Sequence, residues 1–138
     1  MRNFPAAYAP TARNNLALVL LRLNRSPADL TRALLLAEQA VRAEPSNLAF
    51  QDTLGFVQLD ANQRPAAMRS FRSVLEQADA RTDRMIVVSA QVGLAQALAT
   101  GSDTEKAEAR ELLSKLEGQK LPPDLRRRVD AARSAAVR

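Results

Sequence analysis

Apolar residues recur every three or four positions along most of the chain, which is the spacing of one face of an α-helix. Polar runs, prolines and glycines interrupt this periodicity and mark the ends of the helical segments. The interruptions predict seven helices, near residues 10–24, 27–43, 46–61, 65–79, 83–99, 104–117 and 122–136. The best candidate for a strand, Ile86-Val87-Val88, is flanked by sequence that continues the helical pattern. The pattern therefore predicts an all-α protein.

Residues that commonly begin or end helices stand at these boundaries. Ser26 offers a capping hydroxyl directly before Pro27, and proline suits the first turn of a helix. Ser46 is placed to cap the third helix in the same way. Gly101 and Gly118 stand where helices are expected to end, because glycine adopts the left-handed conformation at little cost.

A pattern of small residues repeats along the chain. Leu16-Ala17, Leu54-Gly55 and Val92-Gly93 are separated by equal steps, since 55 − 17 = 38 and 93 − 55 = 38. The helix that follows each pair carries a small residue and, one turn later, another apolar residue: Ala33 and Ala37, Ala67 and Phe71, Ala109 and Leu113. A small residue lets a neighbouring helix approach closely, and a larger one a turn away covers the contact. The repeat therefore predicts three stacked antiparallel helix pairs.

The middle pair, LGFVQLDANQRPAAMRSF, resembles a tetratricopeptide repeat, whose pattern places alanine twelve residues after Leu-Gly and phenylalanine four residues later. The helix pairs before and after it match the same pattern, with four additional residues between the small residue of the first helix and the alanine of the second. The three matches together cover roughly residues 10–118. Pro45 stands where this family often closes a repeat. The sequences Asn14–Ala17 and Asp52–Gly55 resemble segments of bacterial repeat proteins.

The resemblance implies a right-handed α-solenoid of three antiparallel helix hairpins with a C-terminal capping helix. The expected units are residues 10–47, 48–81 and 82–119, preceded by a tail at 1–9 and followed by the capping helix at 120–138. A capping helix covers the last apolar face and presents polar residues to water, which suits the run Arg126–Arg128. Continuing the repeat spacing, 109 + 22 = 131, puts Ala131 beside the small position of this helix.

The resemblance also implies a concave groove, lined by the first helix of each unit, that binds a peptide or a helix of a partner protein. The expected groove residues are Asn14, Leu18, Arg22, Asp52, Phe56, Leu59, Ala90 and Leu94, with Leu21, Asp60 and Ala97 as neighbouring alternatives. Phe56 is the strongest single candidate, because an aromatic ring supplies a large contact area. A carboxylate-binding clamp is not expected, since Asp52 stands where a cation would be needed. Packing between units is the other interpretation of Leu18, Phe56 and Leu94.

The net charge of +5 raises nucleic acid as a second class of partner. Nucleic-acid binding needs basic side chains gathered on one face. Here 20 lysines and arginines are interleaved with 15 acids, apart from Arg126–Arg128, which argues against that class. Self-association as a structural segment of a larger repeat protein is a third possibility. The sequence alone does not distinguish cytoplasm from periplasm.

Catalysis is not predicted. The chain has no cysteine and no histidine, which removes the commonest nucleophile, general base and metal ligands. No phosphate-binding loop is present. Asp52 and Asp60 would lie about two helical turns apart, too far for one reacting centre. We therefore expect neither a cofactor nor a metal, and no run approaches the roughly 18 apolar residues of a membrane span.

Two of the five aromatic residues, Phe4 and Tyr8, precede the first repeat. They lie in a segment that contains proline, outside the predicted helix pairs. One hypothesis is that this tail packs onto the first unit or into the groove of the same or a neighbouring chain. The alternative is that the two residues belong to a further, upstream repeat.

Overall fold

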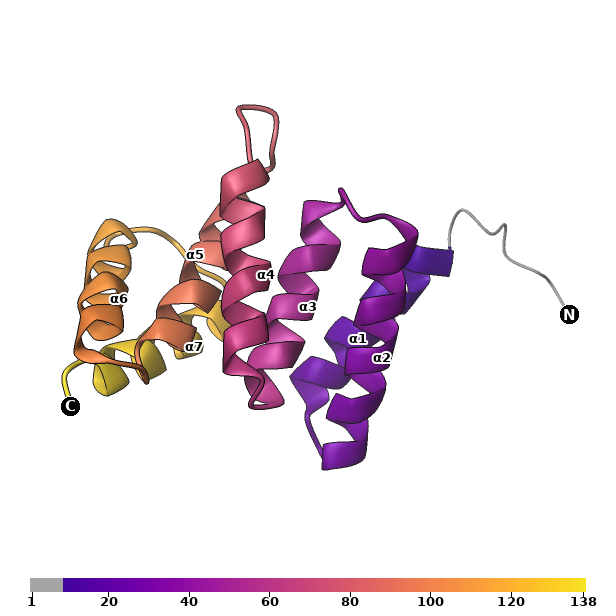
Figure 1. The fold of residues 1–138 in the computed structure, drawn as a ribbon, viewed down its shortest axis with the longest axis horizontal. Coiled ribbons are helices and arrows are strands. Elements are labelled where there is room, and N and C mark those ends of the chain that lie inside the picture. Colours follow the sequence, from indigo (N-terminus) through magenta and orange to yellow (C-terminus); the bar gives the residue numbers. More distant parts are fainter. Residues whose placement is uncertain (1–8) are drawn as a thin grey trace, which may run out of the picture.

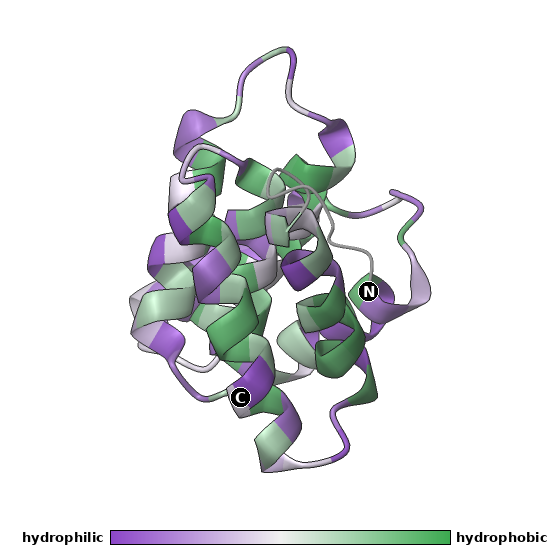
Figure 2. Cartoon of the chain, turned by 90° about the vertical axis from the view of Figure 1, so that its right-hand side faces the viewer, coloured by the Kyte–Doolittle hydropathy of each residue, from purple (hydrophilic) through white to green (hydrophobic). Residues whose placement is uncertain are grey.

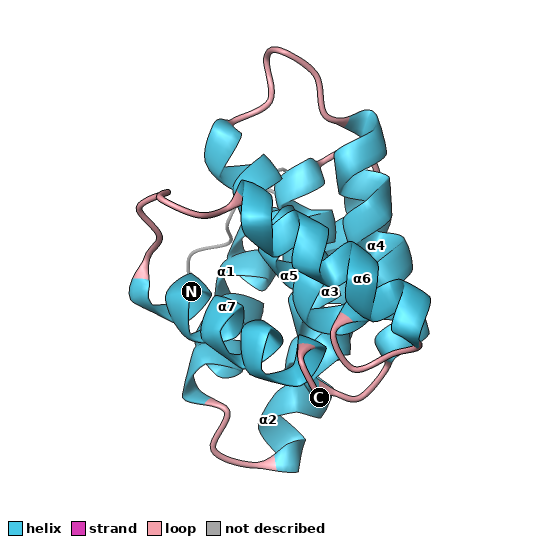
Figure 3. Ribbon diagram, turned by 90° about the vertical axis from the view of Figure 1, so that its left-hand side faces the viewer, coloured by secondary structure: helices cyan, strands magenta, loops and turns pink. Residues whose placement is uncertain are grey.

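The computed structural model describes residues 9–138, so the hypothesis about Phe4 and Tyr8 lies outside the described part of the chain. Within residues 9–138 the protein is all-α, as predicted, with no strand (Figure 3). The helices are α1 (Ala9–Leu23), α2 (Pro27–Ala43), α3 (Leu48–Asp60), α4 (Arg64–Gln77), α5 (Arg84–Leu98), α6 (Asp103–Lys115) and α7 (Pro123–Ala136). Each end lies within two residues of the predicted one.

Consecutive helices form three antiparallel pairs, α1–α2, α3–α4 and α5–α6, joined by short loops (Figure 1). The first helices also contact one another in sequence, α1 with α3, α3 with α5 and α5 with α7. They therefore form a continuous layer, against which α2, α4 and α6 pack. Hydrophobic residues gather on the helices, whereas the loops are mostly hydrophilic (Figure 2).

The ends of the helices follow the local chemistry with two corrections, the first being that Gly101 does not take the left-handed conformation expected of it. The Ser26 hydroxyl caps α2 by accepting a hydrogen bond from the backbone N–H of Asp29 at 3.3 Å. The prediction that Ser46 caps α3 is wrong, because the Asn47 side chain accepts from the N–H of Phe50 instead. Gly118 does take the left-handed conformation, with φ of +79°.

Phe71 on α4 lies at the centre of the predicted small-residue contact. Its ring is fully buried and occupies the space that side chains at Gly55 and Gly93 would need. A Cβ atom on Gly55 would stand 2.6 Å from the Phe71 Cε1 atom, and one on Gly93 would collide with the same ring. Ala67 is also fully buried. One aromatic ring therefore contacts both α3 and α5, which only glycine permits at this separation.

Ion pairs connect the second helices of neighbouring pairs. Arg72 on α4 donates to both carboxylate oxygens of Glu108 on α6, at 2.9 and 3.0 Å. Arg64 donates from Nε to the Ala97 carbonyl at 2.7 Å and pairs with Glu105 at 2.8 Å. Glu105 and Glu108 therefore connect α6 to α4, in addition to any favourable interaction with the dipole of α6.

The last helix, α7, contacts both α5 and α6. It buries Leu125, Val129, Ala132 and Ala136. The predicted small position at Ala131 is displaced by one residue, because Ala131 is exposed and Ala132 is buried. Four apolar residues at helical spacing thus bury one face of α7 against the rest of the protein.

Candidate functional site

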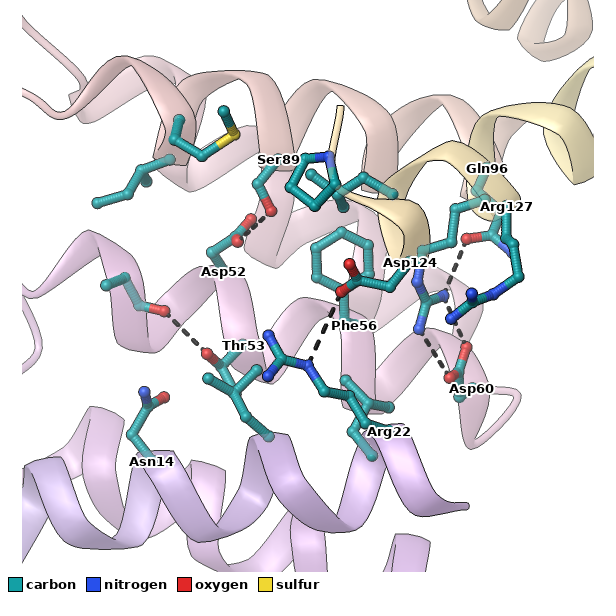
Figure 4. Close-up of a pocket in the computed structure, with 18 of the residues that line it drawn as sticks. Asn14, Arg22, Asp52, Thr53, Phe56, Asp60, Ser89, Gln96, Asp124 and Arg127 are labelled. Atoms are coloured by element: carbon teal, nitrogen blue, oxygen red, sulfur yellow. Dashed lines mark hydrogen bonds and ion pairs between the residues drawn. The ribbon is translucent and has the colours of Figure 1, made fainter. Parts of the chain in front are cut away.

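A cavity of about 660 Å³ lies among α1, α3, α5 and α7 (Figure 4). Its lining residues come from these four helices or from the residues directly at their ends. No residue of α2, α4 or α6 contributes to it. The cavity therefore lies on the layer of first helices, the helices that the resemblance implies would line a groove.

The structure brings five of the eight predicted groove residues to this cavity: Asn14, Leu18, Arg22, Asp52 and Phe56. The neighbouring alternatives Leu21 and Asp60 line it as well. These residues are spaced three or four apart on α1 and α3, so each helix presents one face to the cavity. On these two helices the resemblance and the structure select the same face.

The other three predicted residues, Leu59, Ala90 and Leu94, do not line the cavity. Ala90 is fully buried and Leu94 is 2% exposed, within a helix that packs against α3, α4, α6 and α7. In their place α5 contributes Met85, Ile86, Ser89 and Gln96. The cavity face of α5 is therefore turned by about one residue from the predicted one.

Asp52 is the central acid of the cavity. Its Oδ2 atom accepts a hydrogen bond from the Ser89 hydroxyl at 2.6 Å, which links α3 to α5 (Figure 4). Its Oδ1 atom is buried without a hydrogen-bond partner among the described residues. Burial raises the pKa of Asp52 to about 7, although the Ser89 hydrogen bond and the charge of Arg128 act in the opposite direction.

Asn14 is the second polar residue with an unused acceptor. Its side chain projects from α1 toward α3 and is only 6% exposed (Figure 4). The Oδ1 atom of its amide has no hydrogen-bond partner in the part of the chain that the structure describes. The nearby Thr53 hydroxyl does have one, because it donates to the Ala49 carbonyl of its own helix at 3.1 Å.

Arg128 lines the cavity from α7 and connects this helix to α3 and α5. It donates to both carboxylate oxygens of Asp60, at 2.9 Å each, and to the Gln96 side chain at 3.0 Å. Its guanidinium carbon lies 4.6 Å from the centre of the Phe56 ring. The expectation that the run Arg126–Arg128 is entirely solvated is therefore wrong for Arg128, whose side chain is 17% exposed.

A second ion pair joins α7 to α1. The Arg22 Nε atom lies 3.8 Å from a carboxylate oxygen of Asp124, and both side chains are largely exposed. Together the two pairs make α7 the fourth wall of the cavity. The sequence carried no sign of this wall beyond the arginines themselves, because the partners stand far away along the chain.

Within residues 9–138, no group of acidic side chains is arranged to hold a metal ion. Among the helices described, none has the length and apolar character needed to cross a bilayer. No family model, curated protein or solved structure matches the chain. The geometry of the cavity is thus the basis for a functional assignment.

Proposed function

We propose that this protein is a non-catalytic scaffold for protein–protein interaction, and that it binds a peptide or helix of a partner in the cavity among α1, α3, α5 and α7. The observation that carries this proposal is the origin of the lining, which comes only from the first helices and α7. A face built from equivalent positions of successive helix pairs is extended, and extended surfaces suit chain segments.

The proposal includes a tetratricopeptide-like architecture, with units at residues 10–47, 48–81 and 82–119 arranged as a right-handed α-solenoid. Contacts between successive first helices support it, as does the shared burial of the small landmark residues. Phe71 contacts Gly55 within its own helix pair and Gly93 in the next pair, so one side chain joins two neighbouring pairs. In a solenoid each unit packs directly on its neighbours.

The charges around the cavity favour a protein partner over nucleic acid. Three arginines and four aspartates line it: Arg22, Arg127 and Arg128 with Asp52, Asp60, Asp83 and Asp124. Two of the arginines are paired with two of the aspartates. A phosphate backbone requires a continuous cationic track, which this mixture does not provide.

Selection from a displayed peptide library, followed by NMR mapping of the selected peptides on the full chain, tests the proposal. We expect chemical-shift changes on the lining residues of α1, α3, α5 and α7. Met85→Arg should abolish binding, because Met85 lines the cavity and is 43% exposed, so the substitution need not disturb the core. Leu35→Arg is the matched control, since Leu35 is 54% exposed and lies on α2.

Three results would contradict the proposal: no selected peptide, shifts confined to another face, or equal loss of binding in both variants. Substitution of Phe56 or Leu94 is less informative. Phe56 is 5% exposed and packs edge-on against Phe71 at 4.9 Å, so arginine at either position would be expected to unfold the protein.

Self-association is the second candidate, and one observation favours it. Leu16, Val19 and Leu23 share one face of α1 and are 36%, 48% and 46% exposed. An apolar stripe of this kind on the first helix pair offers a surface for a second copy. Light scattering over a concentration series of the wild type and Val19→Arg tests it, and a concentration-independent monomer would exclude it.

A further inference from the structure

Two hydrogen-bond acceptors in the cavity are buried without a donor. They are Oδ1 of Asp52 and Oδ1 of Asn14, on successive first helices. Leaving such atoms unpaired costs free energy, because each has lost water without gaining a protein partner. The neighbouring hydroxyls cannot serve them, since Thr53 donates to Ala49 and Ser89 to the other oxygen of Asp52. A bound group with N–H or O–H donors would satisfy them.

The charge balance indicates that this group is a cation. Asp52 forms no ion pair among the described residues, and Arg128, whose charge acts on it, is already paired with Asp60. The lining carries four carboxylates against three guanidinium groups, which leaves one negative charge in excess when all are ionised. Burial raises the pKa of Asp52 to about 7, so a cation beside it would also restore its ionised form.

Because one oxygen of the Asp52 carboxylate lacks a hydrogen-bond partner, the site favours an ammonium over a guanidinium. A guanidinium binds best when it reaches both oxygens of a carboxylate, as Arg128 does with Asp60. At Asp52 the Ser89 hydroxyl already occupies Oδ2, which leaves Oδ1 alone. A single free acceptor suits the compact point charge of an ammonium.

Apolar side chains stand one turn from each polar group. Leu18 follows Asn14 by four residues on α1, Phe56 follows Asp52 by four on α3, and Ile86 precedes Ser89 by three on α5. A lysine side chain has the matching form, with a chain of methylene groups that packs on apolar surface and a charged end that seeks a polar partner.

We propose that Asp52 receives the ammonium group of a lysine side chain carried by the bound partner segment, with Leu18, Phe56 and Ile86 contacting its methylene groups. This inference depends on the proposed function, because it names the chemistry that the interaction scaffold recognises. The partner is thus a protein segment with an accessible lysine, and the cavity recognises the positive charge of that lysine.

An NMR titration of the full chain with single-residue probes tests the inference without requiring a known partner. The probes are the Nα-acetyl N-methylamides of lysine, norleucine and arginine. We expect the lysine probe to bind roughly tenfold more tightly than norleucine, because it adds one charge-assisted hydrogen bond. The carboxyl carbon of Asp52 should shift, and its titration should move to lower pH in the presence of the lysine probe.

Two variants separate a specific pairing from general attraction. Asp52→Asn retains an acceptor for Ser89 and removes the charge, and it should lower lysine binding to the norleucine level. Asp83→Asn removes another cavity carboxylate while keeping a side chain that can cap α5, and the preference for lysine should persist.

The inference is overturned if lysine and norleucine bind equally, if no probe shifts the lining residues, or if Asp52→Asn leaves the preference intact. Tighter binding of the arginine probe, or equal loss in Asp83→Asn, would also overturn it. Peptides selected from the library distinguish failure of the ammonium site from failure of the scaffold proposal. If selected peptides bind the cavity and replacement of their lysines by norleucine has no effect, the scaffold proposal stands and the ammonium site does not.

Discussion

Arg128 on α7 and Asp60 on α3 form a two-pronged ion pair across 68 positions of the chain, with Nη1–Oδ1 and Nη2–Oδ2 distances of 2.9 Å. Both side chains are mostly buried, at 17% and 20% exposure. Among the side-chain hydrogen bonds within residues 9–138, this pair joins the residues that lie farthest apart in the sequence. It joins α7 to the second helix pair, in addition to the contacts of α7 with α5 and α6.

Removal of this pair should loosen α7. Arg128→Ala leaves Asp60 poorly compensated in a partly buried place, and we expect a loss of about 2 kcal/mol in the free energy of unfolding. Hydrogen exchange of α7 amides should accelerate more than that of α3 amides. Arg127→Ala, an exposed neighbour, should change stability by less than about 0.5 kcal/mol. Equal effects in urea unfolding would show that the pair does not hold α7.

The space around Phe71 predicts that added methyl groups destabilise the core. Gly55→Ala and Gly93→Ala each place a Cβ atom in steric conflict with the Phe71 ring, and each should cost about 1–3 kcal/mol in urea unfolding. Phe71→Leu should reduce that cost, because the smaller side chain vacates part of the space. A double-mutant cycle measures this coupling, and strictly additive effects would contradict the contact.

The raised pKa of Asp52 predicts a pH-dependent penalty. The folded protein holds the proton up to about pH 7, whereas the unfolded chain releases it near the ordinary value of 3.8. Between these values the unfolded state binds fewer protons, so stability falls as pH rises. Asp52→Asn should therefore gain on the order of 4 kcal/mol relative to wild type above pH 7, and nothing from this source below about pH 4. Chemical unfolding across that range measures the difference, and a constant offset would contradict it.

The Arg72–Glu108 pair should give a smaller effect with the opposite pH dependence. The Arg72 hydrogen bond lowers the pKa of Glu108, so its stabilisation is present above the unfolded value and is lost as pH falls through the folded one. Both side chains are 41% exposed, so Glu108→Gln should cost less than about 1 kcal/mol at neutral pH. The cost should shrink at about 1 M salt. Glu111→Gln, an exposed change on the same helix, should show neither dependence.

The small-residue contacts were predictable from the sequence because close packing of helices requires a small side chain at a regular spacing. Ala17, Gly55 and Gly93 therefore indicate where neighbouring helices approach closely, even though the residues around them differ between the three helix pairs. The groove positions on α1 and α3 came instead from the resemblance, and most of them line the cavity.

The cavity face of α5 could not be predicted in the same way. This helix packs against α3, α4, α6 and α7 and buries more than half of its residues, so apolar positions occur on several faces. A helix that is apolar nearly all round gives no direction to its exposed side. Ser89 rather than Ala90 therefore reaches Asp52, and only the tertiary structure shows it. The Arg128–Asp60 pair escaped prediction for a related reason, because nothing local relates residues so far apart.

The ring of Phe71 makes the interiors of two helix pairs depend on each other. Because it fills space left by Gly55 in its own helix pair and by Gly93 in the next, neither pair can complete its interior without the other. Unfolding of residues 48–115 should then be cooperative across both pairs, since fraying of either one opens a void in its neighbour. The boundary between residues 81 and 82 that the sequence pattern predicts should therefore not appear as a separate unfolding transition.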